Sequence, residues 1–148
     1  MKRTPEAMPS CLIAEDEAII AMALADGLEE AGHPVLGLFD KGSAVLEALT
    51  RLNPDIAVLD TRLRDGPSYE VALELWRRGV PFVIYSGHQR PKDPHPAYAD
   101  APWVEKPASP TEVLAAFGPL RGLVLPQLTP DQTVVRAVHF GPTPVVLG

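Results

Sequence analysis

The sequence predicts an α/β fold in which helices cover both faces of a doubly wound, five-stranded parallel sheet. Short apolar runs typical of buried strands alternate along the chain with segments whose apolar residues recur at helical spacing. Such alternation favours a parallel sheet, because parallel strands are usually joined by a helix. Right-handed crossovers then leave the flavodoxin-like strand order 2-1-3-4-5 as the main choice.

The strands and helices are predicted from these runs in chain order. The five strand candidates are the runs CLIA, VLGLF, DIAVL, PFVIY and APWVE, which begin at residues 11, 35, 55, 81 and 101. Helical spacing covers residues 18–31, 43–52, 68–78 and 110–117. Gly32 ends the first helix, Asn53-Pro54 ends the second, and Pro110 suits the first turn of the last.

Length and composition indicate one domain with two extensions. A chain of 148 residues is long enough for one core. We predict an N-terminal extension over residues 1–9, the α/β domain over residues 10–118 and a C-terminal extension of unknown role over residues 119–148. That last stretch is short and interrupted by prolines, which excludes a DNA-binding output domain. Its run TVVRAVHF is β-prone, and both an added edge strand and a loosely ordered tail stay open.

Charge and hydropathy limit the partners and the compartment. Thirteen basic and nineteen acidic residues give a net charge of −6, which does not favour direct nucleic-acid binding. The N-terminal residues lack the apolar core of a signal peptide, and no apolar run is long enough for membrane insertion. With a lone cysteine, Cys11, in an apolar run, these features predict a cytoplasmic protein.

Polar side chains follow several predicted strands, at the edge where such sheets bind ligands. Glu15 and Asp16 follow the first strand, Asp60 follows the third, Ser86 follows the fourth and Lys106 follows the fifth. Three crowded carboxylates raise one another's pKa unless a positive charge cancels them, and Mg²⁺ prefers such ligands. Taken singly, these residues suit helix starts, turns or exposed loops. Together they predict a magnesium site.

This set of residues resembles the receiver domain of two-component response regulators, of the stand-alone type, over roughly residues 10–118. The resemblance covers Glu15-Asp16, Asp60, Ser86 and Lys106-Pro107 on five strand and helix units. It implies that a histidine kinase or phosphotransfer protein donates a phosphoryl group to Asp60 in a magnesium-dependent, self-catalysed reaction. The domain then acts by switching contacts with a downstream protein, and it is not an enzyme in the ordinary sense. A homodimer is left open.

The resemblance also assigns roles to single residues. It implies that Asp16, Asp60 and the backbone carbonyl of Arg62 ligate Mg²⁺, with Glu15 as a supporting acid. Ser86 is then the hydroxyl that contacts the phosphoryl group, and Lys106 is its positive partner. Trp103 on the fifth strand takes the aromatic switch position and works together with Ser86.

Two other functions are weighed against this one. A pseudo-receiver keeps the fold and binds partners without phosphorylation, although intact Asp60 and Lys106 argue against it. A haloacid-dehalogenase type phosphatase also uses an aspartate nucleophile, but it needs a second aspartate two residues later, where this chain has Arg62. The phosphatase is therefore the weaker alternative.

Receivers normally carry a fourth helix between the fourth and fifth strands, and here that segment is residues 87–102. It contains Pro91, Pro94, Pro96 and Pro102, so no uninterrupted helical pattern of useful length fits. Each interior proline costs a helix about 3 kcal/mol. We therefore predict that this helix is absent or reduced to a single turn, leaving a mobile loop beside Ser86 and an altered partner surface.

Overall fold

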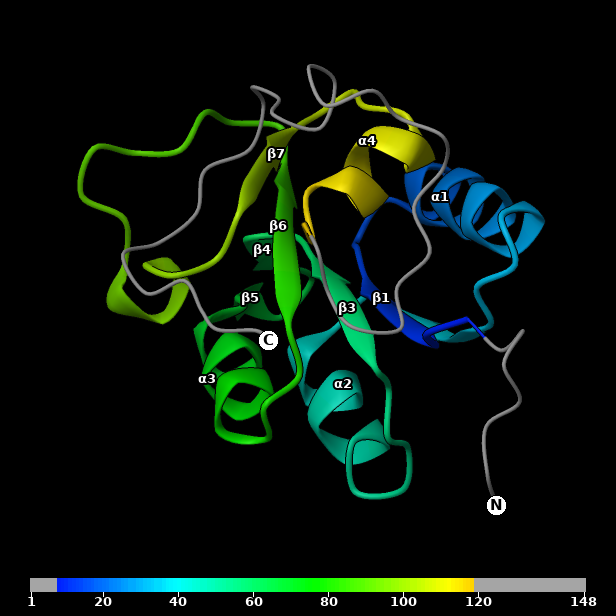
Figure 1. The fold of residues 1–148 in the computed structure, drawn as a ribbon. Helices are drawn as coiled ribbons and strands as arrows, with labels where there is room; N and C mark the ends of the chain where they lie inside the picture. Colours follow the sequence, from blue (N-terminus) through cyan, green and yellow to red (C-terminus); the bar gives the residue numbers. More distant parts are fainter. Residues whose placement is uncertain (1–7, 119–148) are drawn as a thin grey trace.

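The computed structural model describes residues 8–118 and shows a five-stranded parallel sheet (Figure 1). The strands are β1 (Cys11–Ala14), β2 (Val35–Phe39), β3 (Ile56–Leu59), β6 (Phe82–Ser86) and β7 (Trp103–Glu105). Their order is β2-β1-β3-β6-β7, and every neighbouring pair is parallel. This is the order 2-1-3-4-5 for the five predicted strands, so the predicted fold class is confirmed.

Two helical layers cover the sheet. One layer is α1 (Ala18–Glu30) with α4 (Pro110–Ala115), and the other is α2 (Gly42–Ala48) with α3 (Tyr69–Arg77). Figure 1 shows α1 and α4 together on one side of the strands and α2 and α3 on the other. Within residues 8–118, none of the helices is both long and apolar enough to cross a membrane.

Alternating side chains of the central strands separate two hydrophobic cores. In β1, Leu12 and Ala14 pack with α2 and α3, whereas Cys11 and Ile13 pack with α1 and α4. This alternation is what a strand buried on both faces requires, since successive side chains point to opposite sides. The central strands are therefore anchored from both layers, and the residues that follow them at the carboxyl edge are held in fixed positions.

The second helix is shorter than predicted. The sequence predicts helical structure over residues 43–52, but α2 ends at Ala48. After Ala48 the backbone forms a tighter turn, because the Thr50 N–H and hydroxyl both donate to the Glu47 carbonyl, at 3.1 and 2.6 Å. A side chain that bonds the preceding turn in this way competes with regular helical hydrogen bonds. The other helices match their predicted spans to within two residues at each end.

The connection between β3 and α3 contains a small hairpin that was not predicted from the sequence. Here β4 (Arg62–Leu63) pairs antiparallel with β5 (Gly66–Pro67). Gly66 has a φ of +124°, which side-chain-bearing residues rarely adopt. The adjacent Asp65 carboxylate accepts hydrogen bonds from the N–H groups of Gly42 and Ser43 and so caps the start of α2.

Between β6 and β7 the expected helix is reduced to one 3₁₀ turn, η1 (Pro96–Tyr98), as predicted. Figure 1 shows this segment extending away from β6 and returning beside α3. The predicted extension at residues 119–148, and most of the one at residues 1–9, lie outside the described residues, so both domain boundaries stay predictions.

Candidate functional site at the carboxyl edge of the sheet

Three carboxylates meet where β1 and β3 end. Ala14 pairs with Leu59 across these neighbouring strands, and the Asp60 N–H donates to the Ala14 carbonyl at 2.9 Å. One oxygen from each of Glu15, Asp16 and Asp60 lies within 4.8 Å of the others. Glu15 and Asp60 are buried, whereas Asp16 is half-buried. The structure therefore brings together the three predicted acids.

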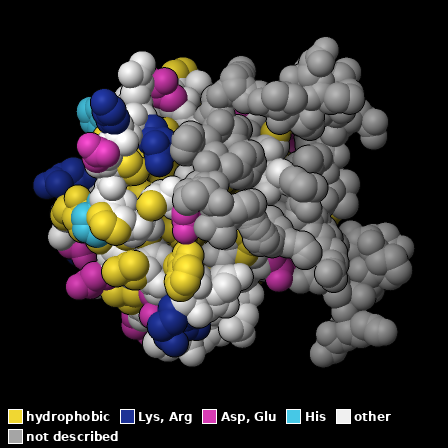
Figure 2. Space-filling view, turned by 60° about the vertical axis from the view of Figure 1, so that its left-hand side comes forward, with side chains coloured by type: hydrophobic (Ala, Val, Ile, Leu, Met, Phe, Trp, Pro, Cys, Tyr) yellow, Lys and Arg dark blue, Asp and Glu magenta, His cyan; other side chains and the backbone are white. Residues whose placement is uncertain are grey.

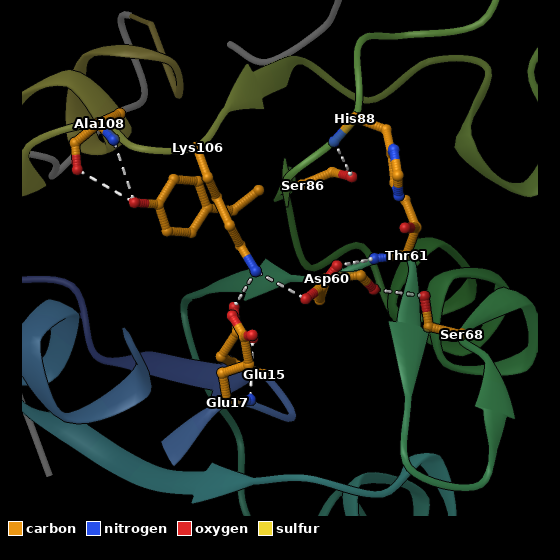
Figure 3. Close-up of polar contacts among 10 residues, drawn as sticks. Glu15, Glu17, Asp60, Thr61, Ser68, Ser86, His88, Lys106 and Ala108 are labelled. Carbon is orange, nitrogen blue, oxygen red and sulfur yellow. Dashed lines mark hydrogen bonds and ion pairs between the residues drawn. The ribbon is translucent and has the colours of Figure 1, made fainter. Parts of the chain in front are cut away.

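Lys106 enters the same cluster from the end of β7 (Figure 3). Its Nζ lies 2.7 Å from Glu15 Oε1 and 2.8 Å from Asp60 Oδ2, and the lysine side chain is 13% exposed. The Tyr85 ring lies beneath the ammonium, with 5.5 Å between Nζ and the ring centroid. The Lys106 ammonium thus forms ion pairs with two buried carboxylates. When all are ionised, the three acids and this lysine together carry a formal charge of −2.

This crowding changes how the groups ionise. Burial raises the pKa of Glu15 to about 7; the Asp60 charge adds to this rise, and Lys106 opposes it. Burial alone would lower the pKa of Lys106, but its ion pairs with Asp60 and Glu15 outweigh that effect and raise it. A buried acid that is hard to ionise beside another carboxylate is a place where a further positive charge is favourable.

The donor set fits a hard divalent cation. Three carboxylate oxygens within reach of one centre are the ligands that Mg²⁺ takes in proteins, usually with water and phosphate oxygens completing its shell. The residues that would hold the ion are Asp16, Asp60 and Glu15. Arg62 lies in β4 with an exposed side chain, and a ligand role for its carbonyl stays a proposal.

Asp60 itself is held by two donors. Its Oδ1 accepts a hydrogen bond from the Thr61 N–H at 2.7 Å, and its Oδ2 accepts one from Lys106 at 2.8 Å. The residue is 8% exposed, and its carboxylate is fixed in orientation at the end of a rigid strand. A charged oxygen held in one orientation is well placed to act as a nucleophile.

Ser86 and Trp103, the two predicted switch residues, meet at the turn after β6. Ser86 is buried, and Figure 3 shows its hydroxyl directed at the backbone N–H of His88, from which it accepts a hydrogen bond of 3.1 Å. The Trp103 indole N–H donates to the His88 carbonyl at 2.9 Å, and the ring is buried in the α2–α3 core. Both residues thus hold the same short turn.

Two further residues at this edge were not found from the sequence. Ser68 donates its hydroxyl to the Asp60 carbonyl at 2.6 Å, and the Tyr98 hydroxyl lies 2.8 Å from that of Ser68. Ser68 precedes α3 and reads as an ordinary helix start. The sequence around Tyr98 does not indicate that it lies near Asp60, because its position depends on the path of the segment between β6 and β7.

The profile of the response regulator receiver domain matches residues 11–117, and this chain belongs to that family. Receiver domains act as phosphoacceptors in two-component signalling, bind Mg²⁺ at an acidic pocket and interact with histidine kinases or phosphotransfer proteins.

Among solved structures, the chain is similar to SdrG from Sphingomonas melonis Fr1, with 32% identity and a TM-score of 0.62 over 74% of this chain and 96% of SdrG. It is also similar to the receiver domain of PhyR from Erythrobacter litoralis, with 24% identity and a TM-score of 0.61 over 73% of this chain and 85% of that one, a likeness that shows the fold alone. The transcriptional regulatory protein PdtaR of Mycobacterium tuberculosis is 34% identical over 74 residues, or 49% of this chain. That match spans 36% of the length of PdtaR.

Proposed function

We propose that this receiver domain accepts a phosphoryl group on Asp60 in a magnesium-dependent reaction and thereby switches its contacts with other proteins. The observation that carries this proposal is the shared ammonium of Lys106, which lies 2.8 Å from Asp60 and 2.7 Å from Glu15. Asp16 completes the cluster of acids. A nucleophilic carboxylate, a fixed cation and a metal-type donor set therefore occupy one site.

In the proposed reaction, an Asp60 carboxylate oxygen attacks the phosphorus of a phosphohistidine on the donor protein. The new bond is an oxygen–phosphorus bond of an acyl phosphate, the nitrogen–phosphorus bond breaks, and the imidazole leaves with the bonding pair and takes up a proton. The transition state is loose, so the protein's task is mainly positioning and neutralisation of charge. Lys106 orients the acceptor carboxylate and neutralises charge, and Mg²⁺ when bound supplies additional positive charge at the phosphoryl oxygens.

Phosphorylation would then act on the turn that follows β6. The Ser86 oxygen now accepts the His88 N–H, and phosphoryl oxygens on Asp60 would accept the Ser86 hydroxyl proton and draw Ser86 toward Asp60. Because Trp103 donates to the His88 carbonyl, movement of this turn changes the hydrogen bond of the indole. Trp103 is already buried, so we propose an exchange of this bond rather than a swing of the ring from solvent. The effect is a shift between two states of the turn.

The start of α1 offers a surface for a phosphodonor protein. Ile19 is 81% exposed and Met22 is 57% exposed, one turn apart on a helix that begins directly after the acidic residues. Large apolar side chains exposed together beside a reactive site favour contact with another protein. This supports a histidine kinase or phosphotransfer protein as the donor.

The test is direct labelling. The protein is incubated with Mg²⁺ and a small phosphoryl donor such as acetyl phosphate, and the modified residue is mapped by mass spectrometry. We expect a base-labile label on Asp60 that Asp60→Asn abolishes. The matched control is Asp26→Asn, on the exposed side of α1, which should label like the parent. Labelling of Asp60→Asn at another residue would contradict the proposed site, and a folded parent that takes no label favours the pseudo-receiver.

A further inference from the structure

Two buried hydroxyl groups lie next to the backbone of Asp60. Ser68 Oγ is 2.6 Å from the carbonyl oxygen of Asp60, and Tyr98 Oη is 3.0 Å from the carbonyl oxygen of Thr61. The two hydroxyl oxygens are 2.8 Å apart. Ser68 is 1% exposed and Tyr98 is 4% exposed, so water does not compete for these contacts. The hydroxyl pair of Ser68 and Tyr98 therefore forms a local hydrogen-bond chain.

The hydroxyl protons of this hydrogen-bond chain can be arranged in two ways. Each hydroxyl carries one proton, so two protons serve three oxygen–oxygen contacts. If both protons went to the carbonyls, the hydroxyl oxygens would face each other without a proton between them. The protons therefore run either from Tyr98 through Ser68 to the Asp60 carbonyl, or from Ser68 through Tyr98 to the Thr61 carbonyl.

The first direction leaves both backbone carbonyls with a donor. The Thr61 carbonyl also accepts the Ser68 N–H at 3.0 Å, so it keeps a donor when the Tyr98 proton points to Ser68. In this arrangement both carbonyls are paired, as buried backbone groups require. The contact between Ser68 and the Asp60 carbonyl is also the shortest of the three.

The Asp60 carbonyl belongs to a rigid peptide group that also forms a hydrogen bond with the Asp60 side chain. This carbonyl and the N–H of Thr61 form one planar peptide group. The N–H donates to Asp60 Oδ1 at 2.7 Å, while the carbonyl accepts the Ser68 hydroxyl. Figure 3 shows both contacts on either side of Asp60. A change in the bonding of the carboxylate would therefore act on the same peptide plane that holds the acceptor of the hydroxyl pair.

The Tyr98 end of this hydrogen-bond chain lies between β6 and β7, in the segment where receiver domains usually have a helix. Tyr98 belongs to η1, and its ring meets Trp103 edge-on with 6.2 Å between ring centroids. Next to it, Tyr69 of α3 stacks on His95 with 3.6 Å between centroids. This packing of rings holds residues 95–98 as one body against α3. Figure 2, in which this side of the molecule comes forward, shows apolar, basic, acidic and histidine side chains mixed on its surface.

We propose that Tyr98 is a positioning residue that couples the Asp60 loop to the segment between β6 and β7, by a route separate from Ser86. The proposal rests on the proposed function of Asp60 as the phosphoacceptor. Phosphorylation tilts the Asp60–Thr61 peptide, the hydroxyl pair reverses or breaks, and η1 shifts with Tyr98. The surface formed by residues 88–98 then differs between the two states of the protein.

The coupling is tested with Tyr98→Phe in a Trp76→Phe background, where Trp103 is the remaining tryptophan. Mg²⁺ with beryllofluoride serves as the phosphoryl mimic, and amide hydrogen exchange over residues 88–99 and Trp103 fluorescence are measured with and without it. In the resting variant we expect exchange to be about fivefold faster, the factor for one lost hydrogen bond. We also expect the changes in hydrogen exchange and Trp103 fluorescence on adding beryllofluoride to be half or less of those in the parent.

Tyr69→Phe is the matched control, because it removes a hydroxyl from the same group of rings but not from the chain between Asp60 and Tyr98. It should respond to beryllofluoride like the parent. Faster resting exchange in Tyr98→Phe with an undiminished response would show a merely structural hydroxyl and overturn the proposal, as would no difference at all.

Failure of the proposed function has a different signature. If the parent neither binds beryllofluoride nor takes a label on Asp60, Asp60 is not a phosphoacceptor. The hydroxyl pair is then judged in the resting protein by a double-mutant cycle of Ser68→Ala and Tyr98→Phe. Unfolding free energies that add independently would overturn the pairing itself, and non-additive values would support it without any phosphorylation.

Discussion

At the scale of single residues, Glu15 holds the most constrained position in the site. It is 4% exposed, it shares Lys106 with Asp60, and Glu17, two residues later, donates its backbone N–H to the Glu15 carboxylate at 3.0 Å. Burial nevertheless raises its pKa to about 7 from 4.5. The folded protein therefore binds a proton at Glu15 more tightly than the unfolded chain does, and ionising this residue works against folding.

The pH dependence of stability follows from this pKa. Without a divalent cation, the contribution of Glu15 to stability is most favourable at or below pH 4.5 and is lost as the pH rises toward about 7. In the presence of a chelator, Glu15→Gln should therefore be more stable than the parent at pH 8, by about 2 kcal/mol, allowing for the lost ion pair. Near pH 4.5 the two proteins should unfold alike. Urea unfolding at both pH values checks this, and an equal difference at both would contradict it.

At the scale of elements, the contact between α1 and α4 depends on a glycine. A Cβ built on Gly27 would lie 2.2 Å from Cγ and 2.8 Å from Cβ of Pro110. Pro110 begins α4, whose start is fixed by a capping box between Ser109 and Glu112. The helix start therefore cannot easily move away, and the absence of a side chain at residue 27 lets the two helices approach closely.

Gly27→Ala tests this packing. Overpacking of this kind costs about 1–3 kcal/mol, and the better helix preference of alanine returns at most about 1 kcal/mol. We expect a net loss of about 1–2 kcal/mol in the free energy of unfolding, measured in urea. Gly87→Ala is the control, because a Cβ there meets no atom within 4 Å, and its stability should match the parent's. Equal stability of Gly27→Ala and the parent would show that α4 moves freely.

At the scale of the whole molecule, a cation bound at the acidic cluster would couple metal binding to folding. The chain carries a net charge of −6, and the cluster around Lys106 adds to a local excess of negative charge. The candidate ligands come from the ends of β1 and β3, which lie side by side only in the folded sheet. A cation bound there therefore stabilises the native protein against the unfolded chain.

We predict that Mg²⁺ raises the melting temperature, and that a concentration one hundred times its dissociation constant adds about 2.7 kcal/mol. Asp16→Ala should remove this effect, since it deletes a half-buried ligand without opening the core. Asp26→Ala, an exposed acid of α1, should keep it. Differential scanning calorimetry with and without Mg²⁺ makes the comparison. A parent protein whose melting temperature ignores Mg²⁺ would contradict the magnesium site.

The sequence by itself determined the strand pattern and the place of the acids. Apolar runs such as CLIA and residues 56–59 are local signals, and the carboxyl ends of parallel strands share one edge. That was enough to predict that Glu15, Asp16 and Asp60 lie together. The four prolines were likewise enough to predict the loss of the helix between β6 and β7, because the backbone restriction of proline acts locally.

The tertiary structure alone decided how these parts are connected. The resemblance already placed Lys106 beside the Asp60 site, but the sharing of its ammonium with Glu15 was not predicted. The Tyr98 hydroxyl likewise reaches the Thr61 carbonyl across 37 positions of the chain. The turn after Ala48 and the capping of α2 by Asp65 depend on similar details of the folded chain. Periodicity reports which face of a strand or helix is buried, but it does not specify which distant side chain meets it. That pairing is settled only when the packed layers fix the path of each loop.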